Sequence, residues 1–219
     1  MSKMTRLIAC LILSVFFATL AYSQAKDEKK GPALGQQLTP EQMAEMMKKW
    51  QATATPGENH KHLEHFVGSW DLTMKMWMAG PESKPTVSKG TAESKWVLGK
   101  RYVQESIKAE MKMPGPDGKE MALPFEGLGL TGYDNFKKVY VATWADDMGT
   151  QLLTMRGNYD PAKKTLAMYG EMDEPAMDLY GRMFKTVTRV VDKDNHVFEM
   201  YDLHVGENFK VMEIAYKRK

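Results

Sequence analysis

The sequence predicts an all-β protein: a single antiparallel meander β-barrel of about ten strands, preceded by one or two short N-terminal helices. Two observations support this class. From Trp70 onward, apolar and polar residues alternate with a period of two, which is typical of strands with one buried face. Short turn sequences such as Leu98-Gly99-Lys100 separate these runs, and short connections join antiparallel neighbours. Closure of such a sheet would remove its two exposed edges.

The strand-like runs lie at residues 70–78, 87–97, 101–113, 125–133, 138–145, 150–159, 164–172, 182–192, 195–203 and 209–217. Charged residues indicate which face meets water. In the second run, Lys89 and Glu93 share one face, so Ala92, Ser94 and Trp96 are expected inside. The same argument places Met212, Ile214, Tyr216 and Arg218 on the inner face of the last run.

Residues 1–23 have the features of a signal peptide. Lys3 and Arg6 form a basic start, and residues 7–20 form an apolar run that is too short to span a bilayer. Small residues at 21 and 23 predict cleavage before Gln24. We therefore expect an exported protein, periplasmic or extracellular, without an integral membrane segment after cleavage. The alternative is a lipoprotein, because residues 7–10 resemble a lipobox, although Cys10 lies inside the apolar run.

Cleavage has consequences for chemistry and charge. Cys10 is the only cysteine, so the mature chain would contain no disulfide, thiol nucleophile or thiolate ligand. Loss of Lys3 and Arg6 lowers the Lys and Arg count from 30 to 28, equal to the 28 Asp and Glu. A neutral mature protein gives no electrostatic reason to expect nucleic acid as a partner.

Three segments follow the signal peptide. Residues 24–38 are polar, contain Gly and Pro, and are expected to form a flexible tether. Residues 39–57 should hold an amphipathic helix, with Thr39 as N-cap, Pro40 at the first position and Gln42 closing a capping box. Its apolar stripe predicts either packing on the barrel exterior or a lid over the barrel mouth: Met43, Met46, Met47 and Trp50. The barrel domain is expected over residues 58–219.

Several stretches resemble known families. Phe66-Val67-Gly68-Ser69-Trp70 resembles the Gly-x-Trp start of calycin barrels such as lipocalins. The longer stretch PFEGLGLTGYDNFKKVYVATWADDMGTQLLTMRGNYD, residues 124–160, resembles the bacterial domain of unknown function 1579 family. His60, the HVFEMYD stretch at 196–202 and the closing Tyr216-Lys217-Arg218 extend this likeness over about residues 58–219. The resemblance implies a barrel fold but no particular activity.

The likeness to calycin barrels implies a way to close the barrel. In those barrels a first-strand Trp closes the base, and a basic residue of the last strand lies across it. Here the pair would be Trp70 and Arg218, with a cation–π contact worth about 0.5–2 kcal/mol. Gly68 would let the chain pass close beneath the barrel without a clash.

Methionine and aromatic residues are the first candidates for ligand binding. Met74 and Met76, together with Met78, Met111 and Met113, could line an adaptable apolar pocket, with Trp96, Tyr140 and Trp144 as its aromatic wall. Two other interpretations remain open. The methionines could simply fill the core, or their thioethers could hold Cu(I).

Polar residues on inner faces are the second group of candidates. Glu105 shares a face with Val103 and Ile107, whereas Arg189 and Glu199 are each flanked by apolar residues at alternate positions. An unpaired charge inside a barrel costs several kcal/mol, so such residues need partners. We expect Glu105, Arg189 and Glu199 to orient a ligand head group. Alternatively, they pair as a structural network or lie outside.

Other motifs give no catalytic or metal site. His60, His62 and His65 lack the spacing of a metal site on one helix or strand, and helix capping explains them better. Gly127, Gly129 and Gly132 have dinucleotide-loop spacing but no following helix. We therefore expect no cofactor and no catalytic motif. The sequence favours an exported binder of a small apolar or amphipathic molecule, with an enzyme using a buried carboxylate, or a pocketless structural module, as alternatives.

Overall fold

A computed structural model describes residues 35, 37–115, 119–207 and 209–219. The predicted signal peptide, including Cys10, and most of the predicted tether lie outside these residues. The chain divides into two units, Met1–Lys49 and Trp50–Lys219, and helix α2 (Pro40–Ala54) crosses that division. None of the helices in the described ranges has the length and apolarity that crossing a bilayer requires.

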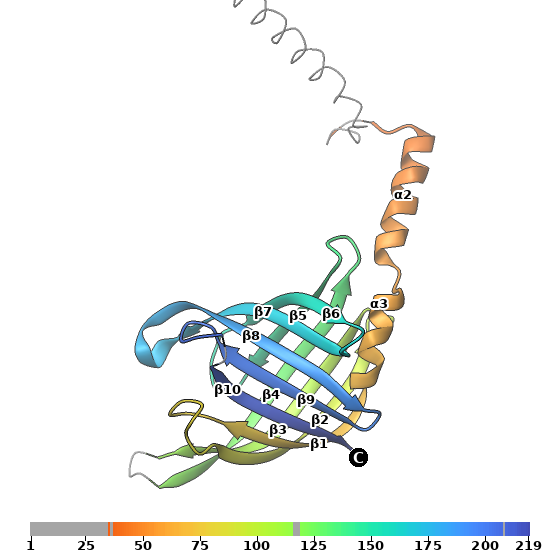
Figure 1. The fold of residues 1–219 in the computed structure, drawn as a ribbon. Helices are drawn as coiled ribbons and strands as arrows, with labels where there is room; N and C mark the ends of the chain where they lie inside the picture. The colour runs from red at the N-terminus through yellow and green to blue at the C-terminus, as the bar shows by residue number, and fades with distance from the viewer. Residues whose placement is uncertain (1–34, 36, 116–118, 208) are drawn as a thin grey trace, which may run out of the picture. The chain divides into compact units, whose positions relative to one another are not determined.

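The second unit contains a closed antiparallel barrel of ten strands, in which β1 pairs with both β2 and β10 (Figure 1). The predicted fold class is confirmed. The strands are β1 (Gly68–Met76), β2 (Thr86–Val97), β3 (Tyr102–Pro114), β4 (Glu120–Asp134), β5 (Val139–Asp146), β6 (Leu153–Asp160), β7 (Thr165–Glu174), β8 (Leu179–Asp192), β9 (Asn195–Asp202) and β10 (Lys210–Arg218). A short 3-10 helix, η2 (Pro175–Met177), lies between β7 and β8.

The antiparallel meander gives the barrel two different ends. Because β1 starts at one end and each strand reverses direction, the connections β1–β2, β3–β4, β5–β6, β7–β8 and β9–β10 share the opposite end, at the left of Figure 1. We call this end the mouth. The other end, where β1 begins and β10 finishes, is the base.

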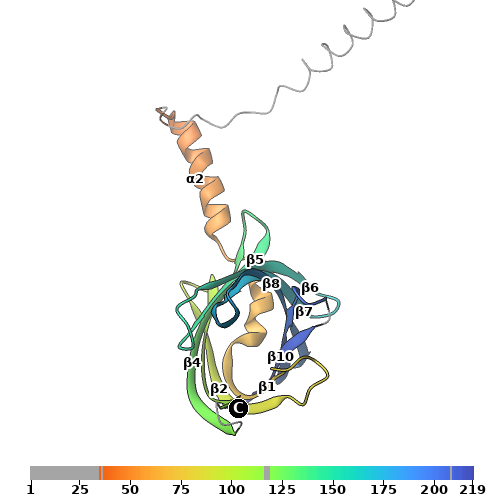
Figure 2. The same ribbon diagram turned by 90° about the vertical axis from the view of Figure 1, so that its left-hand side faces the viewer.

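Two short helices, α3 (Glu58–Lys61) and η1 (His62–Phe66), close the base. Leu63 of η1 is 1% exposed and packs in one cluster with Val103, Tyr140 and Leu166. His62 Nδ1 lies 2.9 Å from the Tyr140 hydroxyl, which also donates to the Asn59 carbonyl at 2.8 Å. Figure 2 looks along the barrel and shows this segment inside the ring of strands. The base is therefore plugged by the residues that precede β1.

Helix α2 begins with the predicted capping box. The backbone N–H of Gln42 donates to Thr39 Oγ1 at 3.3 Å, and the backbone N–H of Thr39 donates to Gln42 Oε1 at 3.0 Å. The helix has no buried residue, and its apolar stripe is exposed by 44–64%. At its C-terminal end, Asn135 of the β4–β5 turn donates to the carbonyls of Thr53 and Thr55. The choice between a lid and a packed helix stays a prediction.

The predicted faces are confirmed in the second, third and last strands. Ala92, Ser94, Ile107 and Ile214 are buried, whereas the charged residues at alternate positions are more exposed. Met78 is a correction, because β1 ends at Met76 and Met78 is 55% exposed in the following loop. The alternation of buried and exposed residues therefore ends where the pairing of β1 ends.

Candidate ligand-binding cavity

The base is sealed by Trp70 and Arg218, which face each other across the β1–β10 pair. The guanidinium carbon of Arg218 lies 4.1 Å from the centroid of the Trp70 ring. Arg218 also donates to the carbonyls of Val67 and His65, both at 2.9 Å, and Trp70 Nε1 donates to the carbonyl of Phe66 at 3.0 Å. These bonds attach the end of η1 to both strands.

Gly68 is required by this seal. Its φ of +137° lies in a region that side-chain-bearing residues rarely adopt. A Cβ built at this position would lie 2.3 Å from Nη1 of Arg218, and the bonds of Arg218 leave that group little room to move. The predicted close passage of the chain beneath the barrel is present, and the group it accommodates is the Arg218 guanidinium.

Toward the mouth, the barrel encloses a cavity of about 470 Å³. Its walls are mainly apolar and include Ile107, Phe125, Phe184 and Phe198. Nine methionines line it: Met74, Met76, Met111, Met113, Met148, Met155, Met172, Met200 and Met212. This volume lies within the range of small-molecule sites, which is about 300–1,000 Å³. The interior is therefore only partly filled by side chains.

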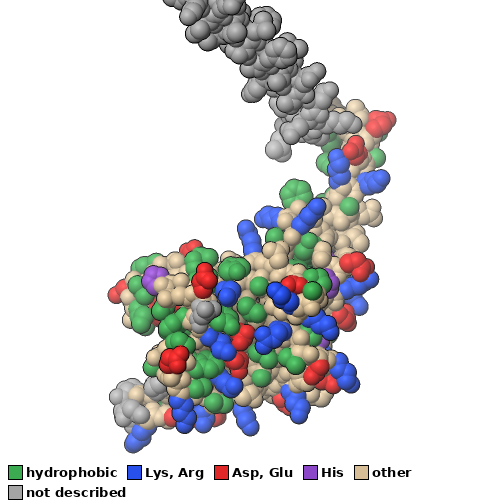
Figure 3. Space-filling view, viewed as in Figure 1, with side chains coloured by type: hydrophobic (Ala, Val, Ile, Leu, Met, Phe, Trp, Pro, Cys, Tyr) green, Lys and Arg blue, Asp and Glu red, His purple; other side chains and the backbone are tan. Residues whose placement is uncertain are grey.

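The mouth carries exposed apolar side chains. Met148, Met177, Tyr180 and Val205, on or beside the mouth loops, are 50–81% exposed. In Figure 3, apolar side chains gather toward the mouth end, and cationic and acidic side chains are interspersed over the rest of this face. An apolar molecule entering the cavity would meet an apolar rim first.

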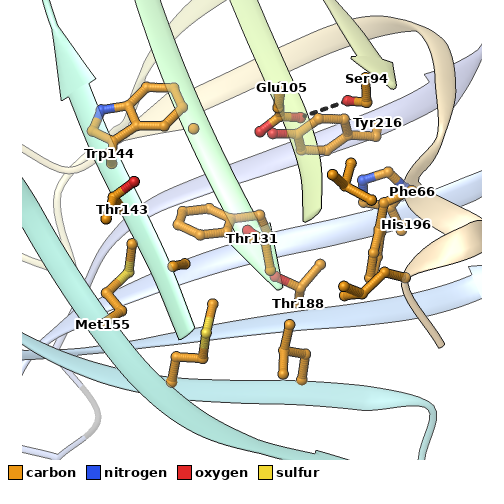
Figure 4. A pocket seen from close by; sticks show the side chains of 17 residues that line it. Phe66, Ser94, Glu105, Thr131, Thr143, Trp144, Met155, Thr188, His196 and Tyr216 are labelled. Atoms are coloured by element: carbon orange, nitrogen blue, oxygen red, sulfur yellow. Dashed lines mark hydrogen bonds between the residues drawn. The ribbon is translucent and has the colours of Figure 1, made fainter. Parts of the chain in front are cut away.

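A second, smaller cavity of about 120 Å³ lies deeper, against Leu63 and Phe66 of η1 (Figure 4). The two cavities share wall residues: Glu105, Trp144, Met155, Phe198 and Tyr216. These five side chains face both cavities, so Glu105 is in contact with the larger and the smaller cavity alike.

Glu105 projects into this interior from β3, as predicted. Ser94 Oγ lies 3.5 Å from Glu105 Oε1, and the Tyr216 hydroxyl is its other hydrogen-bond partner. Glu105 is half-buried, and it lines both cavities. Burial raises the pKa of Glu105 to about 7, although the hydrogen bonds from Tyr216 and Ser94 lower it. The carboxyl group can therefore gain or lose a proton near neutral pH.

His196 packs between the base and the smaller cavity. Its ring stacks on Tyr216, with centroids 4.1 Å apart, and meets the Trp70 ring edge-on at 4.5 Å. Burial, then the nearby His65 and Arg218, lower the pKa of His196 to about 3. Nδ1 of His196 and Nε2 of His65 have no hydrogen-bond partner among the described residues. His196 is therefore neutral in the folded protein.

Trp144 lies where the sequence placed it, on the cavity wall, and glycines make room for it. A Cβ at Gly127 would lie 2.3 Å from Trp144 Cζ2, and one at Gly129 would lie 3.2 Å from Cε3. On the outer face, a Cβ at Gly132 would meet the Tyr102 ring at 2.4 Å. The glycine spacing that resembles a dinucleotide loop thus accommodates two aromatic rings.

The predicted inward positions of Arg189 and Glu199 are wrong. On β8 and β9 the residues that line the cavities are at even positions, such as Thr188 and Phe198, so odd positions face outward. Arg189 is 51% exposed and lies 3.9 Å from Glu199, which also binds Lys210 at 3.1 Å. The valines that flank Arg189 at alternate positions predict an inward face. On a barrel exterior, however, β-branched residues also suit the pleated surface.

Trp96 lies on the predicted inner face of β2, but it is too close to the base to line either cavity. It lies near the base end of β2, and its Nε1 donates to Glu64 Oε2 of η1 at 2.8 Å rather than lining either cavity. Tyr140 is likewise a base residue. Alternation reveals which face a residue occupies, but depth depends on where the strand enters the barrel.

The histidines at the base have structural contacts. His60 Nδ1 accepts from the N–H of Gly57 at 3.1 Å, and His62 stacks on Tyr159 with centroids 4.4 Å apart. In the ranges that the structure describes, no group of three or more His, Cys, Asp or Glu residues is arranged to hold a metal ion.

Sequence reasoning missed part of the wall. Phe184, Phe198 and Met200 come from β8 and β9, the two strands on which the predicted inward face is wrong. Periodicity predicts Tyr216 on the inner face but does not predict its contact with Glu105, because β10 and β3 come together only when the barrel closes. The sequence signal for the inner face of β8 is the alternation of Phe184, Thr186 and Thr188.

The fold and site define a class: a closed antiparallel barrel, plugged at its base, with an apolar cavity that opens toward its mouth. The chain belongs to the family described as "Protein of unknown function (DUF1579)", whose model matches residues 55–218. The predicted family resemblance is confirmed. No curated protein sequence matches the chain.

Solved structures support the fold alone. Rv2717c from M. tuberculosis is similar, with 13% identity and a TM-score of 0.51, over 75% of this chain and 99% of that one. A de novo designed fluorescence-activating β-barrel has 12% identity and a TM-score of 0.37, over 71% of this chain and 95% of the design. At this level of similarity the designed barrel carries no argument about function.

Proposed function

We propose that this protein binds a small apolar or amphipathic molecule inside the barrel. The observation that carries the proposal is the cavity of about 470 Å³, with its methionine and aromatic walls. Methionine side chains are flexible and polarisable, so such a wall adapts to ligands of different shape. A purely structural module would gain stability from a filled interior, and an unfilled apolar cavity costs stability.

The expected affinity follows from burial. Each buried methylene contributes about 0.8 kcal/mol, so a ten-carbon chain has a gross transfer free energy of about 8 kcal/mol. Ordering the ligand subtracts several kcal/mol, which leaves about 4–5 kcal/mol and dissociation constants of about 0.1–1 mM for simple chains. Tighter binding requires a polar contact, and we propose Glu105 and Tyr216 for it because both line the cavity.

A binding experiment with a cavity-filling variant tests the proposal. Nile red should bind with an increase in fluorescence, and Met155→Trp, which fills space shared by both cavities, should abolish that increase. Thr154→Trp, at the neighbouring exposed position, is the matched control and should bind like the parent protein. Equal binding by both variants would contradict an internal site. Native mass spectrometry of protein purified from its own source would then identify a retained molecule.

Proton-transfer catalysis is a second candidate function. The supporting observation is a carboxyl group of raised pKa beside the Tyr216 hydroxyl, both facing the cavity. An isomerase would exchange a carbon-bound proton of its ligand with solvent. Deuterium incorporation from D₂O into a retained ligand, lost in Glu105→Gln, would support this candidate over binding alone.

Export completes the proposal. A signal peptide over residues 1–23 would deliver the barrel to a periplasm or the extracellular space, where it would hold its ligand outside the cytoplasm. The test is N-terminal sequencing of the protein from its own source. A mature chain that starts at Gln24 supports export as a soluble protein, whereas one that starts at a lipidated Cys10 supports the lipoprotein alternative.

A further inference from the structure

The charged side chains that line the larger cavity are all acidic. Four carboxylates line it: Glu105, Asp146, Asp173 and Glu174. Among the described residues that form its wall there is no Lys, Arg or His. This asymmetry disfavours a ligand carboxylate or phosphate, because like charges repel strongly where water is excluded.

The carboxylates nearer the mouth already have partners. Asp146 accepts from Trp144 Nε1 at 2.8 Å, and Asp173 accepts from the N–H of Gly181 at 2.9 Å. Glu174 lies 3.6 Å from Arg182, which also pairs with the buried Asp202. Arg182 is thus shared between two acids.

Glu105 differs from these groups. Its partners, Ser94 and Tyr216, are neutral, and the ion pairs of the described residues include none to Glu105. A buried carboxylate is stabilised strongly by a cation at contact distance and weakly by hydroxyl groups. The wall that the two cavities share therefore holds an acid without a counter-ion among mainly apolar side chains.

The deeper cavity contributes no cation either. Its described wall includes no Lys or Arg, and His196, which lines it together with Glu105, is neutral. An ammonium group carries up to three N–H donors, so a donor-rich cation suits the carboxyl group of Glu105 better than an acceptor-rich anion.

We propose that the cavity selects apolar ligands bearing a basic amine, whose ammonium group pairs with Glu105 while the chain lies among the methionines. This inference rests on the proposed function. Binding forms no covalent bond. When Glu105 starts protonated, its proton passes either to a neutral amine or to solvent as an ammonium ion enters, so the bound pair is neutral overall.

Three probes with the same chain test this proposal: decylamine, decanol and decanoate, titrated at pH 8 by calorimetry below their aggregation concentrations. Decylamine should bind at least about tenfold tighter than decanol, and decanoate at least about tenfold weaker than decanol. Equal or tighter binding of decanoate overturns the proposal. If decanol and Nile red both fail to bind, the proposed function fails; if decanol binds without a preference for the amine, only this inference fails.

Two variants test whether Glu105 causes the preference for the amine. Glu105→Gln keeps the side-chain size and hydrogen-bonding capacity, and should remove the amine preference while changing decanol affinity less than about twofold. Glu199→Gln removes a carboxylate from the outer face and should leave all three affinities unchanged. An amine preference that survives Glu105→Gln, or that disappears in Glu199→Gln, overturns the assignment to Glu105. The comparison of probes on the unmodified protein decides the question even if Glu105→Gln does not fold.

Discussion

The guanidinium carbon of Arg218 lies 4.1 Å from the centroid of the Trp70 ring, so the last residues of β10 and the first of β1 seal the base together. The contact is supported by hydrogen bonds from both side chains to the carbonyls of the segment that precedes β1. The seal of the base and the position of the η1 plug therefore depend on one cluster of contacts at the end of the β1–β10 pair.

Trp70→Ala should lower the free energy of unfolding by about 3–5 kcal/mol, because the ring is 0% exposed and its loss leaves a cavity. Denaturant unfolding followed by circular dichroism measures this change. Trp50→Ala is the control, since Trp50 is 64% exposed and its loss should change stability by less than about 0.5 kcal/mol. Equal midpoints for Trp70→Ala and the parent protein would remove the seal as an explanation.

Gly68→Ala should destabilise the barrel by at least about 1–2 kcal/mol, from backbone strain and from the clash with Arg218. In an Arg218→Ala background only the backbone part remains, so a double-mutant cycle should show a favourable coupling. Gly57→Ala is the control, because a Cβ there would meet nothing within 4 Å. Strict additivity in the cycle would contradict the predicted clash.

Glu105 should make stability depend on pH. Its pKa is about 7 in the folded protein against an ordinary 4.5, so the folded state binds more protons between these values. The free energy of unfolding should therefore fall as pH rises from 4.5 through 7, by up to about 3 kcal/mol. Glu105→Gln should abolish this slope and be more stable than the parent protein at pH 8. Urea unfolding at pH 5.5 and pH 8 measures both proteins, and an unchanged slope in the variant would refute the assignment.

His196 should act in the opposite direction. Its pKa is about 3 in the folded protein against 6.5 ordinarily, so the unfolded state binds more protons in this range and stability falls as pH falls from 6.5. His196→Phe keeps an aromatic ring and should reduce this loss, which thermal unfolding at pH 7 and pH 4.5 would detect. The exposed His204 provides the control variant, His204→Phe, whose pH dependence should match the parent protein.

Gly127→Ala should cost about 1–3 kcal/mol, because the new methyl group would overlap the six-membered ring of Trp144. Trp144→Phe removes the overlapping atoms, so the double variant should recover part of the loss. Gly149→Ala, in a mouth loop, has only an ordinary contact at 4.0 Å and should be neutral. Unfolding curves of the four proteins give the coupling, and a double variant no better than the sum of its parts would contradict this packing.

Much of the site could be predicted because a strand has a simple periodicity. Charges on alternate positions of β3 placed Glu105 inside, and the same argument placed Met74 and Met76 on the cavity wall. The argument failed on β8 and β9, where apolar residues share the outer face with the charged Arg189 and Glu199. On β8 the inner face carries the polar Thr186 and Thr188, whereas valines flank the exposed Arg189. Hydrophobicity alone therefore predicts the wrong inner face for this strand.

By itself the sequence determined the class of fold and the strands, because these follow from local periodicity. Its resemblance to calycin barrels implied the close approach at Gly68 and the aromatic–cationic pair that seals the base. Only the tertiary structure decided that Tyr216 meets Glu105, that Trp96 lies too near the base to reach the cavity, and that the interior is left partly empty. The reason is geometric. Depth and partnership inside a barrel depend on the register of all ten strands at once, and no single strand carries that information.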